Sequence, residues 1–272
     1  MRFSSPTSLS LKNSLSDSAS NILSSDESSR MLVDKHSPIH MSVDSHRDDD
    51  TLLSLFQLID SSFPTGSFAH SFGLETYTQY GLVNDRWTFE TYLRSVLQHG
   101  VRNGDAVAVT LAYKTTDIEY IIDLDTRLTA LKTPDESRQG SIKTGKQFLR
   151  NANRLFDHEK LDAYRACIQS GKCAGHHAIA YGLVTQSASI DLHTSLLGYL
   201  HAYVVGQVSA AIRLIPLGAT DGQLVIQAVH PELVEIATFV ECAEPGNLGN
   251  FTPGLDIRSM QHERLYSRLF VS

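Results

Sequence analysis

The stretch Asp60-Ser61-Ser62-Phe63-Pro64-Thr65-Gly66-Ser67-Phe68-Ala69-His70-Ser71-Phe72-Gly73-Leu74-Glu75 carries the strongest structural signals of this chain. Residues 51–59 before it are largely apolar, which predicts a buried helix. Pro64 disfavours helix at the residue before it, and Gly66 permits a tight turn. Ser67 is a good N-cap for a second helix over 67–80, on which Gly73 allows a neighbour to come close. The stretch therefore predicts two helices joined by a tight turn.

The same stretch resembles the signature near the start of UreF-type urease accessory proteins, at Phe63, Pro64, Gly66, His70, Ser71, Gly73 and Glu75. A second match ends the sequence, at Leu255, Asp256, Arg258, Met260, His262, Glu263, Tyr266, Arg268, Leu269 and Phe270. A third, weaker match covers residues 206–218, with Gly206, Gln207, Ser209, Ala210, Arg213, Pro216 and Gly218. The resemblance runs in order from about residue 52 to residue 272, and three ordered motifs are far more specific than one short pattern.

The resemblance implies an all-α, non-catalytic scaffold without a cofactor of its own, which acts in the maturation of the nickel enzyme urease. It implies UreD-type and UreG-type accessory proteins as partners, with which the chain docks on apo-urease and assists lysine carbamylation and nickel insertion. GTP hydrolysis is expected in the UreG-type partner, and this chain couples it to metal delivery. A homodimer stays open. The partner-binding residues that the resemblance implies are Phe63, Pro64, Gly66, His70, Ser71, Gly73, Glu75, Arg258, Met260, His262, Glu263, Tyr266, Arg268, Leu269 and Phe270.

The first part of the chain differs from the rest in composition. Residues 1–45 contain 15 serines and a single aromatic residue, Phe3. Such a segment cannot bury enough apolar surface to offset its ordering entropy, so residues 1–48 are predicted to be a disordered extension. The segment has no continuous apolar stretch typical of a secretory signal, and its acidic residues argue against a mitochondrial transit peptide. The sequence therefore predicts a cytoplasmic protein.

Charge and cysteine content narrow the class of protein further. The formal net charge is −7 with an isoelectric point near 5.9, which does not favour a nucleic-acid partner. Three cysteines, an odd number, fit a reducing compartment better than a disulfide scaffold. No apolar run approaches the ~20 residues that span a membrane, so we expect no membrane partner.

The remaining sequence predicts a single all-α domain of about 8–10 helices over residues 49–243. The expected helices follow caps, apolar periodicity and glycine or proline breaks. Beyond 51–59 and 67–80 they cover residues 85–101, 105–114, 117–132, 135–156, 159–169, 176–187, 191–214 and 231–242.

Residues 244–272 are expected to form an extended tail that binds a partner. Prolines and glycines at positions 245, 246, 249, 253 and 254 exclude a helix from its first part. The rest combines apolar residues with Arg258, Arg264 and Arg268, a composition typical of interface cores. The alternative is that the tail packs on its own domain.

Two alternatives would place an active site in this chain, and the first of them uses His70. His70, Ser71 and Asp60 could form a Ser–His–acid set of a helical hydrolase, but adjacent residues on one helix point about 100° apart, which disfavours their hydrogen bond. Capping, turn formation and packing are therefore the favoured explanation of these residues.

Cys167, Cys173, His176 and His177 form the one metal-like cluster, with ligand types that suit zinc or nickel in a metal-binding enzyme. Their spacing is not that of a standard site, so they are weak candidates, and buried cysteine is equally a small hydrophobe. Residues 140–147 resemble a phosphate-binding loop only superficially, because the hydroxyl after Lys146 is missing.

Overall fold

The computed structural model describes residues 43–272, with side chains from Asp48 onward. Most of the predicted disordered extension, residues 1–48, lies outside the described residues. The described part is all-helical and contains no strand, which confirms the predicted fold class. Its α-helices are α1 (Val43–Ile59), α2 (Leu74–Gln79), α3 (Arg86–Val96), α4 (Val107–Lys114), α5 (Ile118–Leu131), α6 (Asp135–Ala152), α7 (Glu159–Gln169), α8 (His177–Ser187), α9 (Leu192–Leu214), α10 (Ala219–Glu241) and α11 (Pro253–His262), with short 3-10 turns at η1 (Ser67–Ala69) and η3 (Pro245–Asn247).

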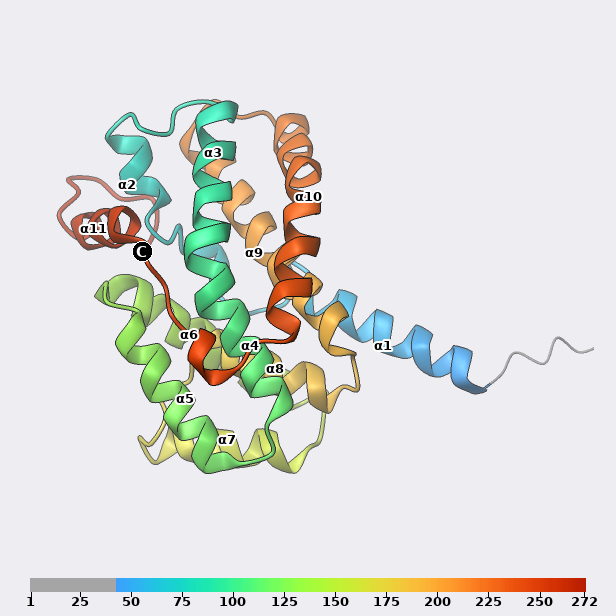
Figure 1. The fold of residues 1–272 in the computed structure, drawn as a ribbon. Helices are drawn as coiled ribbons and strands as arrows, with labels where there is room; N and C mark the ends of the chain where they lie inside the picture. Colours follow the sequence, from blue (N-terminus) through green and yellow to red (C-terminus); the bar gives the residue numbers. More distant parts are fainter. Residues whose placement is uncertain (1–42) are drawn as a thin grey trace, which may run out of the picture. The chain divides into compact units, whose positions relative to one another are not determined.

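Helices α8 and α9 form the centre of the core. Residues 178–185 of α8 are all buried, and α8 packs between α4 and α6. Helix α9 lies beside α10, with which it forms a long antiparallel pair (Figure 1). Small residues bring these helices together: a Cβ on Gly182 would lie 2.5 Å from the carbonyl oxygen of Val109. A Cβ on Gly145 would collide with the backbone at Gly175, so the glycine that gave residues 140–147 their loop-like appearance serves helix packing instead.

The two helices predicted over 85–101 and 105–114 are not separated by a break. Helix α3 continues through a π-helical segment, η2 (Leu97–Ala106), directly into α4 (Figure 1). Such segments are rare and often occur at functional sites. The carbonyl oxygens of His99 and Asn103 accept the amides of Phe251 and Gly249 at 3.4 and 2.8 Å. The start of the tail is thereby fixed along η2.

Helix α10 is also longer than predicted, because Pro231 lies inside it rather than at its start. Proline removes one helical hydrogen bond and usually ends or kinks a helix. Here the buried side of α10 continues across the proline, with Val225 and Val229 before it and Leu233 and Ile236 after it. We infer that this packing offsets the missing hydrogen bond.

Within residues 43–272, α9 alone is long and apolar enough to cross a membrane by length and composition. Its most apolar window is 56% buried inside the domain, as is usual for a core helix. The helix does not stand out in the sequence as such a candidate, because its apolar residues are interrupted by polar ones.

A buried acid holds the connection between α7 and α8. Asp125 of α5 is 1% exposed and accepts the hydroxyl of Tyr164 at 2.8 Å. It also accepts the amides of Ala174 and Gly175 at 2.6 and 3.0 Å, and that of His176 at 3.4 Å. These bonds fix the residues that enter α8.

Candidate functional site

The turn quoted first contains a shorter helix than predicted. Gly66 has a φ of 80°, and a Cβ added there would meet no atom within 4 Å, which agrees with a tight turn. The chain then leaves helical geometry, with φ of 50° at Phe72 and 93° at Gly73, and α2 begins only at Leu74. The predicted helix over 67–80 is therefore wrong in its first half. The amides of Ser71 and Phe72, which a helix would have used, bond to the carbonyl oxygen of Ser272 at 2.6 and 3.1 Å.

The tail, residues 244–272, packs on its own domain and contains a helix. Helix α11 begins at Pro253, a residue type suited to the first helical position, and packs against α2 and α6 (Figure 1). A Cβ at Gly73 would lie 2.6 Å from Oγ of Ser259, so this glycine gives α11 its close approach. The extended form expected for this segment therefore applies only to parts of it, before and after α11.

Glu75 is the main anchor of the tail. It is 2% exposed and accepts the amides of Leu269 and Phe270 at 2.6 and 3.1 Å. Nε2 of His262 lies 2.9 Å from Oε2 of the same carboxylate, and Nδ1 of His262 lies 2.5 Å from Glu136. We call Ser71, Glu75, Glu136 and His262 the tail clamp. It joins α2, α6 and α11 through charged hydrogen bonds that are largely shielded from solvent.

Two further contacts complete the attachment of the tail. The guanidinium of Arg213 lies 3.8 Å from the ring centre of Phe68 and 4.3 Å from that of Phe270. Gln207 donates to the carbonyl oxygen of Ser71 at 3.3 Å. The three matching motifs, far apart in sequence, thus meet at one place in the fold.

His70 and Ser71 do not form the Ser–His–acid set of a hydrolase. Nδ1 of His70 faces Oγ of Ser272 at 2.7 Å, whereas Oγ of Ser71 donates to the carbonyl oxygen of Ser272 at 2.8 Å. Asp60 accepts the amide of Ser62 at 2.7 Å, within its own turn. Burial, together with the charge of Lys143, lowers the pKa of His70. Both residues fasten the tail, and none of the hydrogen bonds of the described residues joins His70 to a carboxylate.

The implied partner-binding residues separate into a buried and an exposed group. His70, Ser71, Gly73, Glu75, His262 and Phe270 are buried and hold the tail. Phe63 and Arg258 are half-buried. The exposed group contains Pro64, Gly66, Met260, Glu263, Tyr266, Arg268 and Leu269. Arg258 stacks on Tyr80, and Arg268 pairs with Glu136 at 2.8 Å. Sequence reasoning missed Glu136, whose one signal was the polar character of the first part of its helix.

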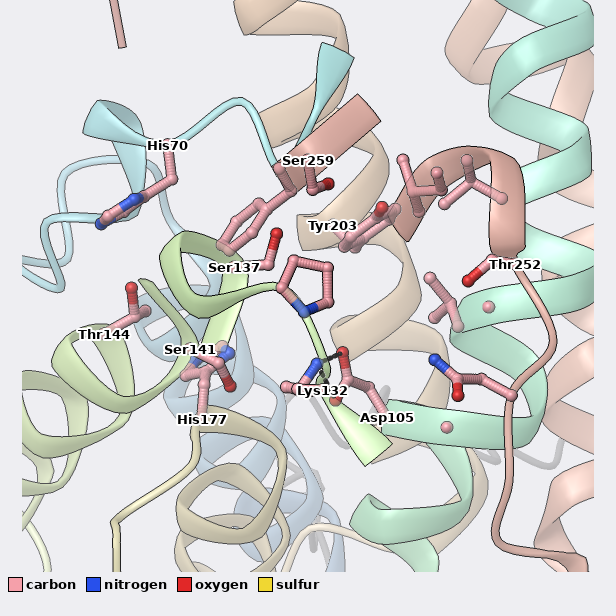
Figure 2. Close-up of a pocket in the computed structure, with 18 of the residues that line it drawn as sticks. His70, Asp105, Lys132, Ser137, Ser141, Thr144, His177, Tyr203, Thr252 and Ser259 are labelled. Carbon is pink, nitrogen blue, oxygen red and sulfur yellow. Dashed lines mark hydrogen bonds and ion pairs between the residues drawn. The ribbon is translucent and has the colours of Figure 1, made fainter. Parts of the chain in front are cut away.

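A cavity of about 200 Å³ lies between the turn and α11, next to residues that neighbour the clamp in sequence. Its walls come from the turn, η2, α9 and α11, and from the connection between α5 and α6 (Figure 2). Most of the lining is apolar, and Lys132 and Asp105 form an ion pair at 2.9 Å on one wall. His177 of α8 and Tyr203 of α9 reach the same space (Figure 2). The cavity therefore borders each of the three motifs.

The cysteine and histidine cluster does not converge on a metal position. Nε2 of His176 bonds to Oγ1 of Thr129 at 2.9 Å, and its Nδ1 faces Oγ of Ser141 at 3.1 Å. His177 packs among the rings of aromatic residues. Burial raises the pKa of the Cys173 thiol to about 12. Among residues with described side chains, no group of three potential ligands could hold a metal ion.

The two buried histidines predict a loss of stability in acid. Burial lowers the pKa of both His176 and His177 from 6.5 to about 4. Both are neutral in folded and unfolded protein well above pH 6.5, but below it the unfolded chain binds protons that the folded one does not. The free energy of unfolding should therefore fall between pH 6.5 and 4, by about 2 kcal/mol for each histidine at about pH 5. Urea titrations at about pH 7.5 and 5 measure this difference. The variant H177F should show a clearly smaller one, and equal differences in both proteins would contradict the assignment.

Glycine substitutions test the close approach of α11. Both Gly66 and Gly73 have positive φ, so alanine at either costs about 1 kcal/mol in backbone strain. G73A must also rotate the Ser259 hydroxyl away and shift Leu255, whose methyl carbon would lie 3.1 Å from the new Cβ, whereas a Cβ on Gly66 meets open space. Thermal unfolding should show a loss for G73A that is larger by at least about 1 kcal/mol, with G66A as the matched control. Equal losses would mean that α11 does not rest on Gly73.

Comparison with known proteins identifies a family for this chain. A family model described as UreF matches residues 83–230. The urease accessory protein UreF of Lachnoclostridium phytofermentans is 36% identical over 227 residues, which cover 82% of this chain and 100% of the relative. The proteins of the same name from Paenarthrobacter aurescens and Bacillus sp. strain TB-90 are each 35% identical, over 81% of this chain and 97% and 99% of their own lengths.

The fold and the clamp place this chain in the class of all-helical proteins, with three distant segments that meet around the attached tail. The comparisons specify the class further. The chain belongs to the UreF family of urease accessory proteins.

Proposed function

We propose that this chain is a non-catalytic scaffold in the cytoplasmic complex that matures urease by nickel insertion. In this proposal it binds UreD-type and UreG-type accessory proteins, and through them apo-urease. GTP hydrolysis occurs in the UreG-type partner, and the chain couples it to metal delivery. Membership in the UreF family supports this role.

The proposal rests mainly on which residues of the tail are buried and which are exposed. Its buried residues are used for attachment, as described for Glu75 and His262. Tyr266 and Leu269 remain exposed, with Tyr266 fully so. Large apolar and aromatic side chains held on a fixed backbone are suited to binding a protein partner, because little ordering entropy is lost on association. The tail clamp thus holds the binding segment in a fixed conformation before the partner binds.

The partner-binding residues of the proposal follow from this division. We assign contact with the UreD-type partner to the exposed tail residues, Met260, Glu263, Tyr266, Arg268 and Leu269. The buried group, with His70, Ser71, Gly73, Glu75, His262 and Phe270, positions them. Phe63 and Pro64 border a shallow depression beside the end of α1, which we propose, together with the adjacent Gly66, as a second contact region.

Complementation of a urease-positive bacterium that lacks its own UreF tests the role. The wild-type chain should restore urease activity and nickel content, whereas the double variant Y266A/L269A should leave urease largely without nickel. L224A/V234A removes exposed apolar side chains from α10 and serves as the matched control, which should complement normally. Full complementation by Y266A/L269A would reject the tail as a contact.

The rival hydrolase or metal-enzyme function is tested on the purified chain. A scaffold should hydrolyse no ester, amide or nucleotide substrate and retain no stoichiometric nickel at neutral pH. Turnover that disappears in H70A, or metal that disappears in C173S, would favour the rival over the proposal.

A further inference from the structure

The cavity between the turn and α11 contains several buried polar atoms whose hydrogen-bonding capacity is unused. Thr144, Gln207 and Ser259 line it and are 2–3% exposed. Oγ1 of Thr144, Oε1 of Gln207 and Oγ of Ser259 have no hydrogen-bond partner among the described residues. Such buried polar atoms are normally paired, because leaving one unpaired is costly. Three of them around one space indicate a site for a molecule with hydrogen-bonding groups.

The size and walls of the cavity limit that molecule. An apolar cavity of about 150 Å³ accommodates benzene. This one, at about 200 Å³, therefore has room for a ring or a short branched chain with a polar group. Its apolar lining, with a few polar groups that converge, is the usual composition of a small-molecule site.

The charged side chains that line the cavity indicate whether its ligand is a cation or an anion. Lys132 is balanced by Asp105, with which it is paired. Asp256 of α11 is the remaining acid, and burial raises its pKa because the carboxylate loses hydration. A bound cation would offset that loss. His70 and His177 contribute no positive charge near pH 7, because burial lowers the pKa of each.

The aromatic rings and the hydrogen-bond acceptors of the lining also favour a positively charged ligand. The rings of Tyr199 and Tyr203 border the cavity, and aromatic rings attract cations. Oε1 of Gln207 can act only as an acceptor, while its amide nitrogen already donates to Ser71. We propose that the cavity binds a small organic cation, an amine or guanidine with an apolar body, whose N–H groups bond to Asp256 and Gln207.

Three probes of matched shape test the proposal on the full chain. Benzylamine, benzyl alcohol and benzoate share a ring and differ in charge. Isothermal titration near pH 7 should show benzylamine binding at least about tenfold more tightly than benzoate, with benzyl alcohol between them. Failure of benzylamine to bind at millimolar concentrations, or benzoate binding as tightly, would overturn the proposal.

Two variants locate the binding. D256N should weaken benzylamine about five- to tenfold and leave benzyl alcohol unchanged, because only the charge contact is lost. D221N removes an exposed acid from α10 and should alter neither. A202L fills the cavity from α9 and should abolish binding of each probe. If D256N does not fold, the probe series and A202L decide alone, and benzylamine binding that A202L leaves intact would show that the cavity is not the site.

Discussion

Replacement of Glu75 by alanine is expected to detach the end of the tail and abolish urease activation while the helical domain stays folded. The substitution removes the acceptor for the amides of Leu269 and Phe270 and the partner of Nε2 of His262. A buried hydrogen bond to a charged group contributes about 1.5–3 kcal/mol, and here three depend on one carboxylate. The remaining contacts, such as the ring of Phe270 on Arg213, should not hold the segment alone.

Limited trypsin digestion measures the detachment directly. Cleavage after Arg264 and Arg268 should be at least about tenfold faster in E75A, because cleavage follows the fraction of open tail. Circular dichroism should retain the helical signal. E235A, which changes an exposed acid of α10 away from both cleavage sites, should behave as wild type in both assays. Tail cleavage at the wild-type rate in E75A would show that the clamp does not hold the tail.

Replacement of Asp125 by alanine should cause the largest loss of stability. The variant leaves four donors without their acceptor, at Tyr164, Ala174, Gly175 and His176, around a position that solvent hardly reaches. Removing one partner of such a buried charged network costs about 3–5 kcal/mol. For a domain of this size that corresponds to a fall in melting temperature of roughly 10 °C.

Urea unfolding with matched variants measures this loss. D123A changes an exposed acid of the same helix and should cost less than about 0.5 kcal/mol. Y164F removes one of the four donors and should cost about 1 kcal/mol. A loss in D125A no larger than in D123A would be incompatible with the network.

Helix bounds were predicted well where caps and breaks in the neighbouring sequence determine them. Helix α7 has the predicted bounds, and α9 begins after Asp191, whose side chain accepts the amide of Thr194 as an N-cap should. Predictions failed where distant residues compete with local preference. Ser67 is a sound N-cap by type, yet the tail takes the amides of Ser71 and Phe72, so the helix cannot start there.

The candidate site was predictable in its members but not in its arrangement. The motif residues His70, Glu75 and His262 were selected by resemblance, which gave no indication that they belong to one attachment. Glu75 and His262 are 187 positions apart, and no periodicity links residues at that separation. Glu136, the second acid of the clamp, lacked even a motif. The cavity follows from the packing of helices, which composition does not encode.

The affinity of the chain for the UreD-type partner that we propose tests the central claim most directly. The purified wild-type chain, Y266A/L269A and L224A/V234A are titrated against that partner by isothermal calorimetry. One anchor residue contributes about 2 kcal/mol or more, so Y266A/L269A should bind at least about thirtyfold more weakly than wild type even if only one of the two side chains is an anchor. L224A/V234A should bind within about twofold of wild type. Equal affinities of all three proteins would contradict the account and place the partner surface elsewhere.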